Sequence, residues 1–177
     1  MAPYPGYTLA RISDLIAFGQ VNVKNYSAIL LHFGTNDIPP TWDKHHKKHM
    51  VKSIDAVVQE YKSLVQLIRR DNSQAYIVLS AIIPRPIDHA KTKLRVEAIN
   101  NKVQQWCCTQ NRLIFQPTYK FFIKAGSPVL SYFSPSDRLH LRGAGIKRLQ
   151  QCMQQALSEK NLAKANHWRR KPSSGAK

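Results

Sequence analysis

Acidic residues are scarce in this sequence. Ten Asp and Glu residues stand against 27 Lys and Arg residues, so the formal net charge is +17. This excess is larger than solubility requires, and it favours a polyanionic neighbour such as nucleic acid or an anionic membrane face. The cations are spread along the chain rather than confined to one motif, so a generally basic, solvated surface is the alternative explanation.

Long apolar runs and paired cysteines are also lacking. No segment approaches the roughly 20 apolar residues of a membrane span, and the first residues lack the basic start and apolar stretch of a secretory signal. We therefore expect no membrane span and a cytoplasmic or nuclear location. The three cysteines, Cys107, Cys108 and Cys152, make neither a disulfide framework nor a metal-ligand spacing, so reduced, structural thiols are predicted.

The sequence does contain short apolar runs that alternate with segments of helical periodicity. Residues 29–33, 76–82 and 113–115 are predicted to be buried, parallel, neighbouring strands. Strand and helix follow each other throughout, which favours a parallel sheet flanked by helices. We expect one α/β domain over residues 1–160 and a basic, flexible tail over residues 161–177.

Helical spacing of apolar residues predicts three amphipathic helices after the first strand. The first has apolar residues from Met50 to Ile68, and the second has Thr92 as its candidate N-cap. The last covers about residues 145–160 and carries its apolar face on Ile146, Leu149, Met153 and Leu157.

Polar and glycine residues mark the ends of core elements in three places: PGYTL around Gly6, GTND at residues 34–37, and DRLHL at residues 137–141. Parallel strands line one crevice with their carboxyl ends, so we expect the three to converge. Asp137 precedes His140 by three residues, so its carboxylate can accept the Nδ1 proton and leave Nε2 as a general base. Alternatively, Asp137 caps a turn and His140 is an ordinary surface or core histidine.

The second block supplies candidate oxyanion donors. The side-chain amide of Asn36 could donate to an oxyanion, together with the backbone N–H of Gly6, and Gly34 removes side-chain bulk where a substrate must approach. A turn residue after a strand is the alternative for Asn36.

Taken in this order, the three blocks resemble the second, third and fifth sequence blocks of the SGNH hydrolases, also called the GDSL family of esterases and lipases, over roughly residues 5–157. The resemblance implies a three-layer α/β/α fold with a flavodoxin-like parallel sheet, and ester hydrolysis through serine without a cofactor. It implies His140 as catalytic base, Asp137 as orienting acid, Asn36 and Gly6 as oxyanion donors, and Gly34 and Asp37 as supporting residues. A similarity to domains of retrotransposon open reading frames would account for the basic charge.

The nucleophile block of this family, Gly-Asp-Ser at the end of the first strand, has no counterpart, because only five residues precede Gly6. We expect an N-terminally incomplete domain that lacks its first strand and is inactive as this chain; a genuine short product is the alternative. Ser13 lies in a predicted helix and Ser80 in a predicted buried strand. Ser134 and Ser136 lie in the loop before the histidine, where no family pattern places a nucleophile.

His45 and His49 stand four residues apart, a spacing that could ligate zinc on one face of a helix. The nearby Lys44, Lys47, Lys48 and Lys52 would repel a cation, so a solvated basic helix start and no metal are predicted.

The sequence as a whole leaves two hypotheses for the function. One is a serine ester hydrolase domain that acts on an ester of unspecified type. The other is a noncatalytic, retroelement-derived basic protein that binds nucleic acid nonspecifically.

Overall fold

Three parallel strands form the centre of the molecule. The computed structural model describes residues 6–43, 48–158 and 162–163. The strands β1 (Ala28–Leu31), β4 (Tyr76–Ser80) and β5 (Leu113–Gln116) lie in the order β1-β4-β5, and both pairings are parallel. Their nearly unbroken apolar sequences suit strands that are covered on both faces. The prediction of three parallel neighbouring strands is confirmed.

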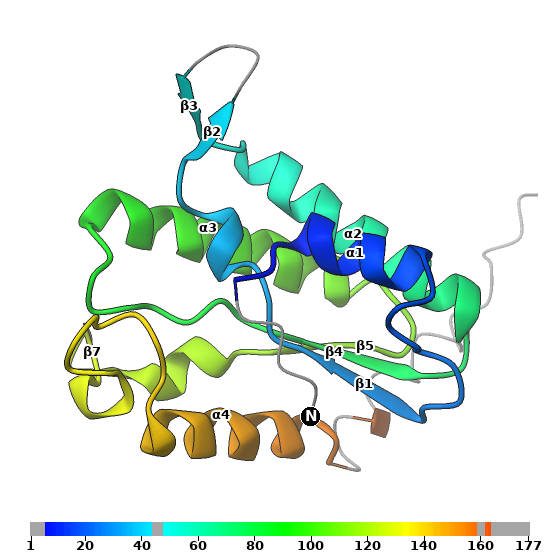
Figure 1. Ribbon diagram of the computed structural model, residues 1–177. Helices are drawn as coiled ribbons and strands as arrows, with labels where there is room; N and C mark the ends of the chain where they lie inside the picture. Colours follow the sequence, from blue (N-terminus) through cyan, green and yellow to red (C-terminus); the bar gives the residue numbers. More distant parts are fainter. Residues whose placement is uncertain (1–5, 44–47, 159–161, 164–177) are drawn as a thin grey trace, which may run out of the picture.

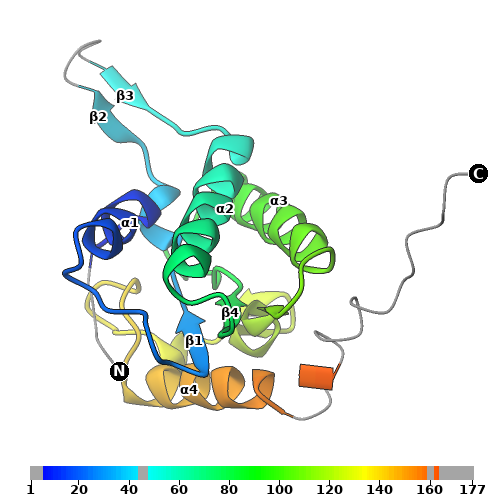
Figure 2. The same ribbon diagram turned by 90° about the vertical axis from the view of Figure 1, so that its right-hand side faces the viewer.

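Helices cover both faces of the sheet, as Figures 1 and 2 show. One face carries α1 (Leu9–Ala17), α2 (Ile54–Asp71) and α3 (Ala90–Cys107), and the other carries α4 (Gly143–Ala156). Side chains alternate between the faces along each strand. Ile77 and Leu79 therefore pack with the first three helices, whereas Val78 packs with Met153 of α4. The predicted three-layer α/β/α architecture is confirmed.

Two short hairpins interrupt this pattern. The hairpin β2 (Thr41–Asp43) and β3 (Lys48–Met50) projects from the helical layer, as seen at the top of Figure 1, and β6 (Ile123–Lys124) pairs with β7 (Ser127–Pro128). Met50 and His49 thus lie in a strand, and the predicted basic helix start there is wrong. Ser53 begins α2 instead, because its hydroxyl accepts the N–H of Ala56 at 3.0 Å. His45, Lys44 and Lys47 lie outside the described residues.

The start of α3 and the apolar face of α4 also differ from the prediction. Helix α3 begins after His89, so Thr92 is inside the helix and is not its cap. In α4, Cys152, Met153 and Ala156 are buried, but Ile146 is 44% exposed. Helix α4 starts at Gly143, and its buried face runs through Gly145, Cys152 and Ala156, so Ile146 lies at the edge of that face.

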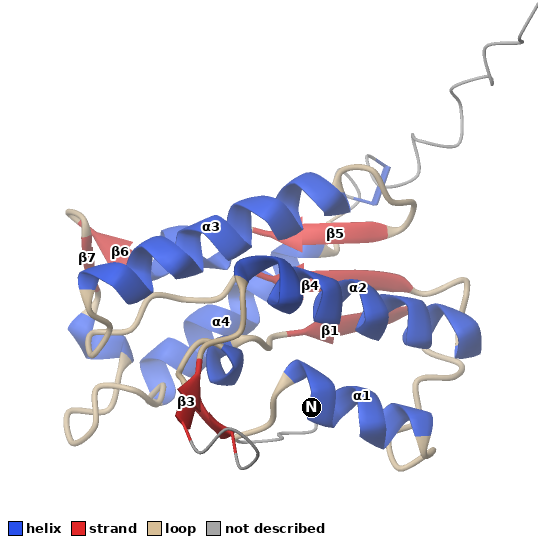
Figure 3. Cartoon of the chain, turned by 90° about the horizontal axis from the view of Figure 1, so that it is seen from above, coloured by secondary structure: helices blue, strands red, loops and turns tan. Residues whose placement is uncertain are grey.

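Strand β1 forms an edge of the sheet. Among the described residues it pairs only with β4, and Leu30 is 40% exposed. Helix α1 packs on α2 and lies beyond β1 when the molecule is seen from above (Figure 3). Within the described ranges, no helix is long and apolar enough to cross a bilayer. The predicted tail lies outside these ranges except for residues 162–163, so it stays a prediction.

Candidate active site

The three predicted site segments all lie at the carboxyl-end side of the sheet. The 3-10 helix η1 (Thr35–Asp37) follows β1, and residues 133–142 form the loop before α4. Figure 1 shows both on the side to which the strands run, with the segment that leads into α1 beside η1. The prediction that Asn36 and His140 face one crevice stays a prediction.

Asp137 and His140 form a hydrogen-bonded pair. Asp137 Oδ2 lies 2.8 Å from His140 Nδ1, while Oδ1 accepts the backbone N–H groups of Leu139 at 2.8 Å and His140 at 3.0 Å. The hydrogen bond to the His140 ring, followed by these two backbone bonds, lowers the pKa of the Asp137 carboxyl to about 2. An ionised carboxylate at Nδ1 favours the tautomer with its proton on Nδ1. Nε2 is then the basic nitrogen, on a side chain that is 72% exposed.

Buried aromatic residues hold this loop in place. Phe133 is buried and stacks edge-on against Phe122, with ring centroids 6.3 Å apart. The carbonyl of His140 accepts the Ser134 N–H at 2.8 Å, which closes the loop around the pair. Gly145 allows α4 to approach, because a Cβ there would lie 2.2 Å from the Tyr132 carbonyl oxygen. The loop is therefore a fixed support for an exposed imidazole.

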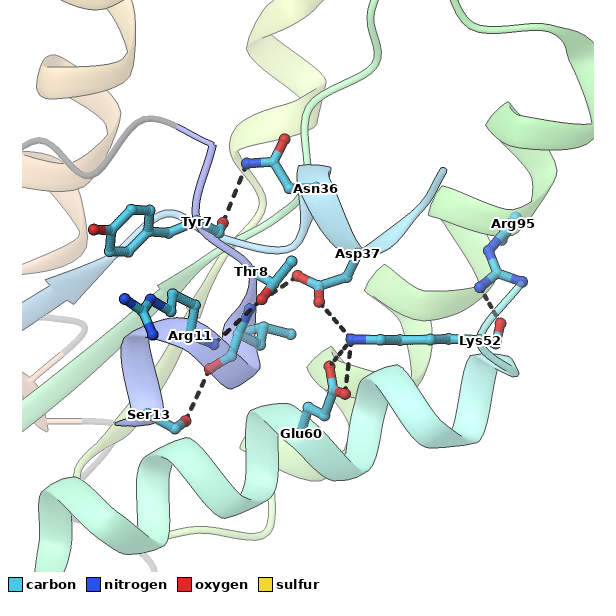
Figure 4. A network of polar contacts seen from close by, with 10 residues as sticks. Tyr7, Thr8, Arg11, Ser13, Asn36, Asp37, Lys52, Glu60 and Arg95 are labelled. Carbon is cyan, nitrogen blue, oxygen red and sulfur yellow. Dashed lines mark hydrogen bonds and ion pairs between the residues drawn. The ribbon is translucent and has the colours of Figure 1, made fainter. Parts of the chain in front are cut away.

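Asn36 contacts the segment that begins with Gly6. Its Nδ2 donates to the Tyr7 carbonyl at 3.1 Å, as Figure 4 shows. An amide nitrogen carries two N–H bonds, and the second has no partner among the described residues. Gly6, one residue before Tyr7, is exposed and has a φ of 77°. The two predicted oxyanion donors thus come from adjoining segments.

Gly34 is required by its surroundings. Its φ is 100°, and a Cβ would lie 2.4 Å from Tyr61 Oη and 2.8 Å from Ile82 Cδ1. Tyr61 Oη donates to the Phe33 carbonyl at 2.6 Å, and burial raises the pKa of its phenol. A glycine here lets the chain leave β1 tightly packed against α2 and the end of β4.

Asp37 lies behind the predicted oxyanion donors and is 1% exposed. Its Oδ2 accepts the Leu9 N–H at 3.0 Å, and its Oδ1 accepts Lys52 Nζ at 2.9 Å (Figure 4). Lys52 Nζ also donates to Glu60 Oε2 at 2.8 Å. Burial lowers the pKa of Lys52, but the bonds and charges of Glu60 and Asp37 outweigh it and raise the pKa overall. Sequence reasoning counted Lys52 only among the lysines that would repel a metal cation, and it missed this role.

A row of buried and half-buried polar groups crosses the strand ends on the α4 side. His32 Nδ1 lies 2.9 Å from Ser80 Oγ, which donates to Thr118 Oγ1 at 2.8 Å. Burial lowers the pKa of His32 to about 4, so this imidazole is neutral at physiological pH. Ser80 is 2% exposed and already bonded, so it is structural. Sequence analysis also missed this row, because a single histidine at a strand end carries no spacing pattern.

No serine hydroxyl is hydrogen-bonded to His140 Nε2 in the described part of the chain, and no metal site accompanies this histidine there. The ring makes its hydrogen bond through Nδ1, and no described group of three His, Cys, Asp or Glu residues could hold a metal ion. A cleft of about 220 Å³ lined by Lys62, Arg69 and Trp106 lies at the opposite end of the sheet, near the start of β5. It is too far along the strands to serve the Asp137–His140 pair.

Comparison with solved structures finds the same fold in other proteins, including proteins named as esterases. A Streptococcus pneumonia protein named as a platelet activating factor is 20% identical, with a TM-score of 0.69 over 86% of this chain and 69% of that chain. A carbohydrate esterase family 3 protein of Talaromyces cellulolyticus is 15% identical, with a TM-score of 0.59 over 86% of this chain and 67% of that chain.

The esterase domain of the ORF1 protein from the zebrafish ZfL2-1 retrotransposon is 24% identical, with a TM-score of 0.52 over 87% of this chain and 82% of that chain. Neither family models nor curated protein sequences match the chain. At identities this low, the similarity shows the fold alone.

Proposed function

We propose that this chain carries the general base and oxyanion donors of a serine ester hydrolase. One observation carries the proposal: the 2.8 Å contact between Asp137 Oδ2 and His140 Nδ1 orients an exposed imidazole with Nε2 as its basic atom. Asn36 and the Gly6 N–H are the proposed donors to the oxyanion. Fold neighbours that are esterases or acylhydrolases support the same reaction class.

In the proposed reaction a serine hydroxyl loses its proton to His140 Nε2 while its oxygen attacks the ester carbonyl. Asn36 and Gly6 donate hydrogen bonds to the oxyanion of the tetrahedral intermediate. The imidazolium, stabilised by the Asp137 carboxylate, then returns the proton to the departing alcohol. Water, activated by the same Nε2, hydrolyses the acyl-enzyme and regenerates the serine.

The free edge of β1 is the proposed place for the serine. A parallel strand paired with β1 would end beside Gly34, at the carboxyl-end side that carries His140. Leu30, which is 40% exposed on β1, would be covered by such a strand or its flanking segment. The unpaired backbone groups of an edge strand are a template for this pairing.

The test compares the 177-residue chain with the same chain joined to an N-terminal strand that ends in Gly-Asp-Ser. We expect near-inert behaviour of the first toward p-nitrophenyl acetate and turnover by the second. His140→Ala should abolish that turnover, and Asn36→Ala should lower kcat by about 10²- to 10³-fold. Replacing the added serine by alanine is the control. Turnover by the unjoined chain would reveal another nucleophile, and an inert joined chain would refute the proposal.

A second candidate function is nonspecific nucleic-acid binding without catalysis. Residues 98–158 carry eight Lys and Arg residues and a single carboxylate, Asp137. Phosphate contacts release counterions, so affinity for RNA or DNA should fall linearly with salt on logarithmic axes. Removing residues 160–177 should lower that slope. If a filter-binding assay showed no retention of nucleic acid at low salt, this candidate function would be refuted. A protein with this function would act in the cytoplasm or the nucleus.

A further inference from the structure

Two backbone segments meet at the proposed oxyanion site, and side chains hold them together. One segment leads from Gly6 into α1, and the other is the GTND sequence after β1. Asn36 Nδ2 donates to the Tyr7 carbonyl at 3.1 Å, and the Leu9 N–H donates to Asp37 Oδ2 at 3.0 Å. One bond has its donor in the GTND segment and the other has its donor in the segment before α1, so together they fix the register of the two segments. We call this pair of bonds the clamp.

The carboxylate in this clamp is deeply buried, and a buried charge needs a partner. The Asp37 side chain has no exposed surface, and Lys52 Nζ lies 2.9 Å from its Oδ1. Glu60 of α2 holds the same ammonium group at 2.8 Å. Arg95 of α3 donates to the backbone carbonyl of Lys52 and fixes the chain at that point. Figure 4 shows the ammonium between the two carboxylates.

From this arrangement we infer that Asp37 and Lys52 are positioning residues for the oxyanion donors. Asp37 holds the first N–H of α1, and this fixes the segment from which the Gly6 N–H projects. Lys52 compensates the carboxylate charge, so the clamp depends on a residue that touches neither donor. The catalytic part of this inference rests on the proposed esterase function, whereas the clamp itself concerns the chain as it stands.

The clamp can be tested without any activity, through hydrogen exchange of the Leu9 amide measured by NMR. Lys52→Met leaves a buried carboxylate without its cation, and we expect Leu9 exchange to become at least about tenfold faster, as for loss of a hydrogen bond to a charged group. The double variant Asp37→Asn/Lys52→Met keeps an oxygen acceptor and needs no cation, so it should recover much of the protection. Lys102→Met, which removes an exposed ion pair with Asp55, is the matched control and should leave Leu9 unchanged.

The catalytic part is tested in the chain joined to the Gly-Asp-Ser strand. Lys52→Met should lower kcat by about tenfold or more with little change in KM, because oxyanion donors act mainly in the transition state. The double variant should restore kcat in parallel with Leu9 protection. A structural defect alone would not produce this parallel recovery.

Three results would overturn the inference. Leu9 exchange in Lys52→Met that stays within about twofold of the unsubstituted chain would show that Lys52 does not support the clamp. Faster exchange with unchanged kcat would show that the clamp does not position the donors. If the joined chain is inert before any substitution, both the proposed esterase function and the catalytic part of this inference are refuted. The exchange rates of the Leu9 amide then still test whether Lys52 supports the clamp.

Discussion

Replacing Gly34 by alanine should destabilise the fold far more than the same change at another glycine with positive φ. Gly34 has a φ of 100°, and the added Cβ would lie 2.4 Å from Tyr61 Oη and 2.8 Å from Ile82 Cδ1. Left-handed backbone costs an alanine about 1–3 kcal/mol, and overpacking costs about 1–3 kcal/mol more. Displacing Tyr61 also weakens its 2.6 Å bond to the Phe33 carbonyl, worth about 1 kcal/mol.

Gly126→Ala is the matched control, because Gly126 has a φ of 75° and a Cβ there meets nothing within 4 Å. Both variants carry backbone strain, so their difference isolates the close approach at Gly34. Equilibrium urea unfolding should show Gly34→Ala less stable than Gly126→Ala by about 2–4 kcal/mol. Equal losses in the two variants would refute the steric reasoning.

Three further predictions concern charged groups. Arg69 donates to four backbone carbonyls before β4 and β5, so Arg69→Met should cost roughly 3 kcal/mol in urea unfolding, whereas Arg70→Met, on the exposed side, should leave unfolding unchanged. The pKa of His32 is about 6.5 in the unfolded chain and about 4 in the folded chain. As pH falls from 6.5 to 4, the unfolded chain binds the proton first, so the free energy of unfolding should fall by up to roughly 3 kcal/mol. His32→Gln should remove that fall if it folds; an unchanged pH profile would contradict the assignment. The Asp137 carboxyl should titrate near pH 2 when followed by NMR. Its stabilising effect should be lost as pH falls from about 4 to 2, and His140→Ala should raise the midpoint of the Asp137 titration because it removes the hydrogen bond that lowers this pKa.

Local patterns in the sequence predicted the features that depend on near neighbours. The Asp137–His140 contact spans three residues, so a turn alone brings the groups together. Order and direction of the three strands follow from strand–helix alternation, since crossovers of this kind make parallel neighbours. Gly34, Asn36 and Asp37 were found because they form one block after an apolar run.

Features that depend on distant contacts could not be predicted this way. Lys52 reaches Asp37 and Glu60 only because the β2–β3 hairpin turns the chain back toward α2, and this short polar hairpin has no apolar alternation to mark it. His32 meets Ser80 through strand pairing across 48 residues. The predicted N-cap of α3 was wrong because Thr92 is the better cap by residue type. The actual cap, His89, makes no side-chain capping bond that the sequence could indicate.

The two faces of the sheet are covered unequally, and this determines which part of the fold can unfold locally at the lower free-energy cost. Three helices share the core on one side, whereas on the other side Val78 and Ile114 are covered by α4 together with Leu162 just beyond it. Detachment of α4 would expose a small apolar cluster and leave the larger one intact, so it is the cheaper partial unfolding step. Because the loop that carries Asp137 and His140 leads directly into α4, amide exchange there should report this local opening well below the global free energy of unfolding.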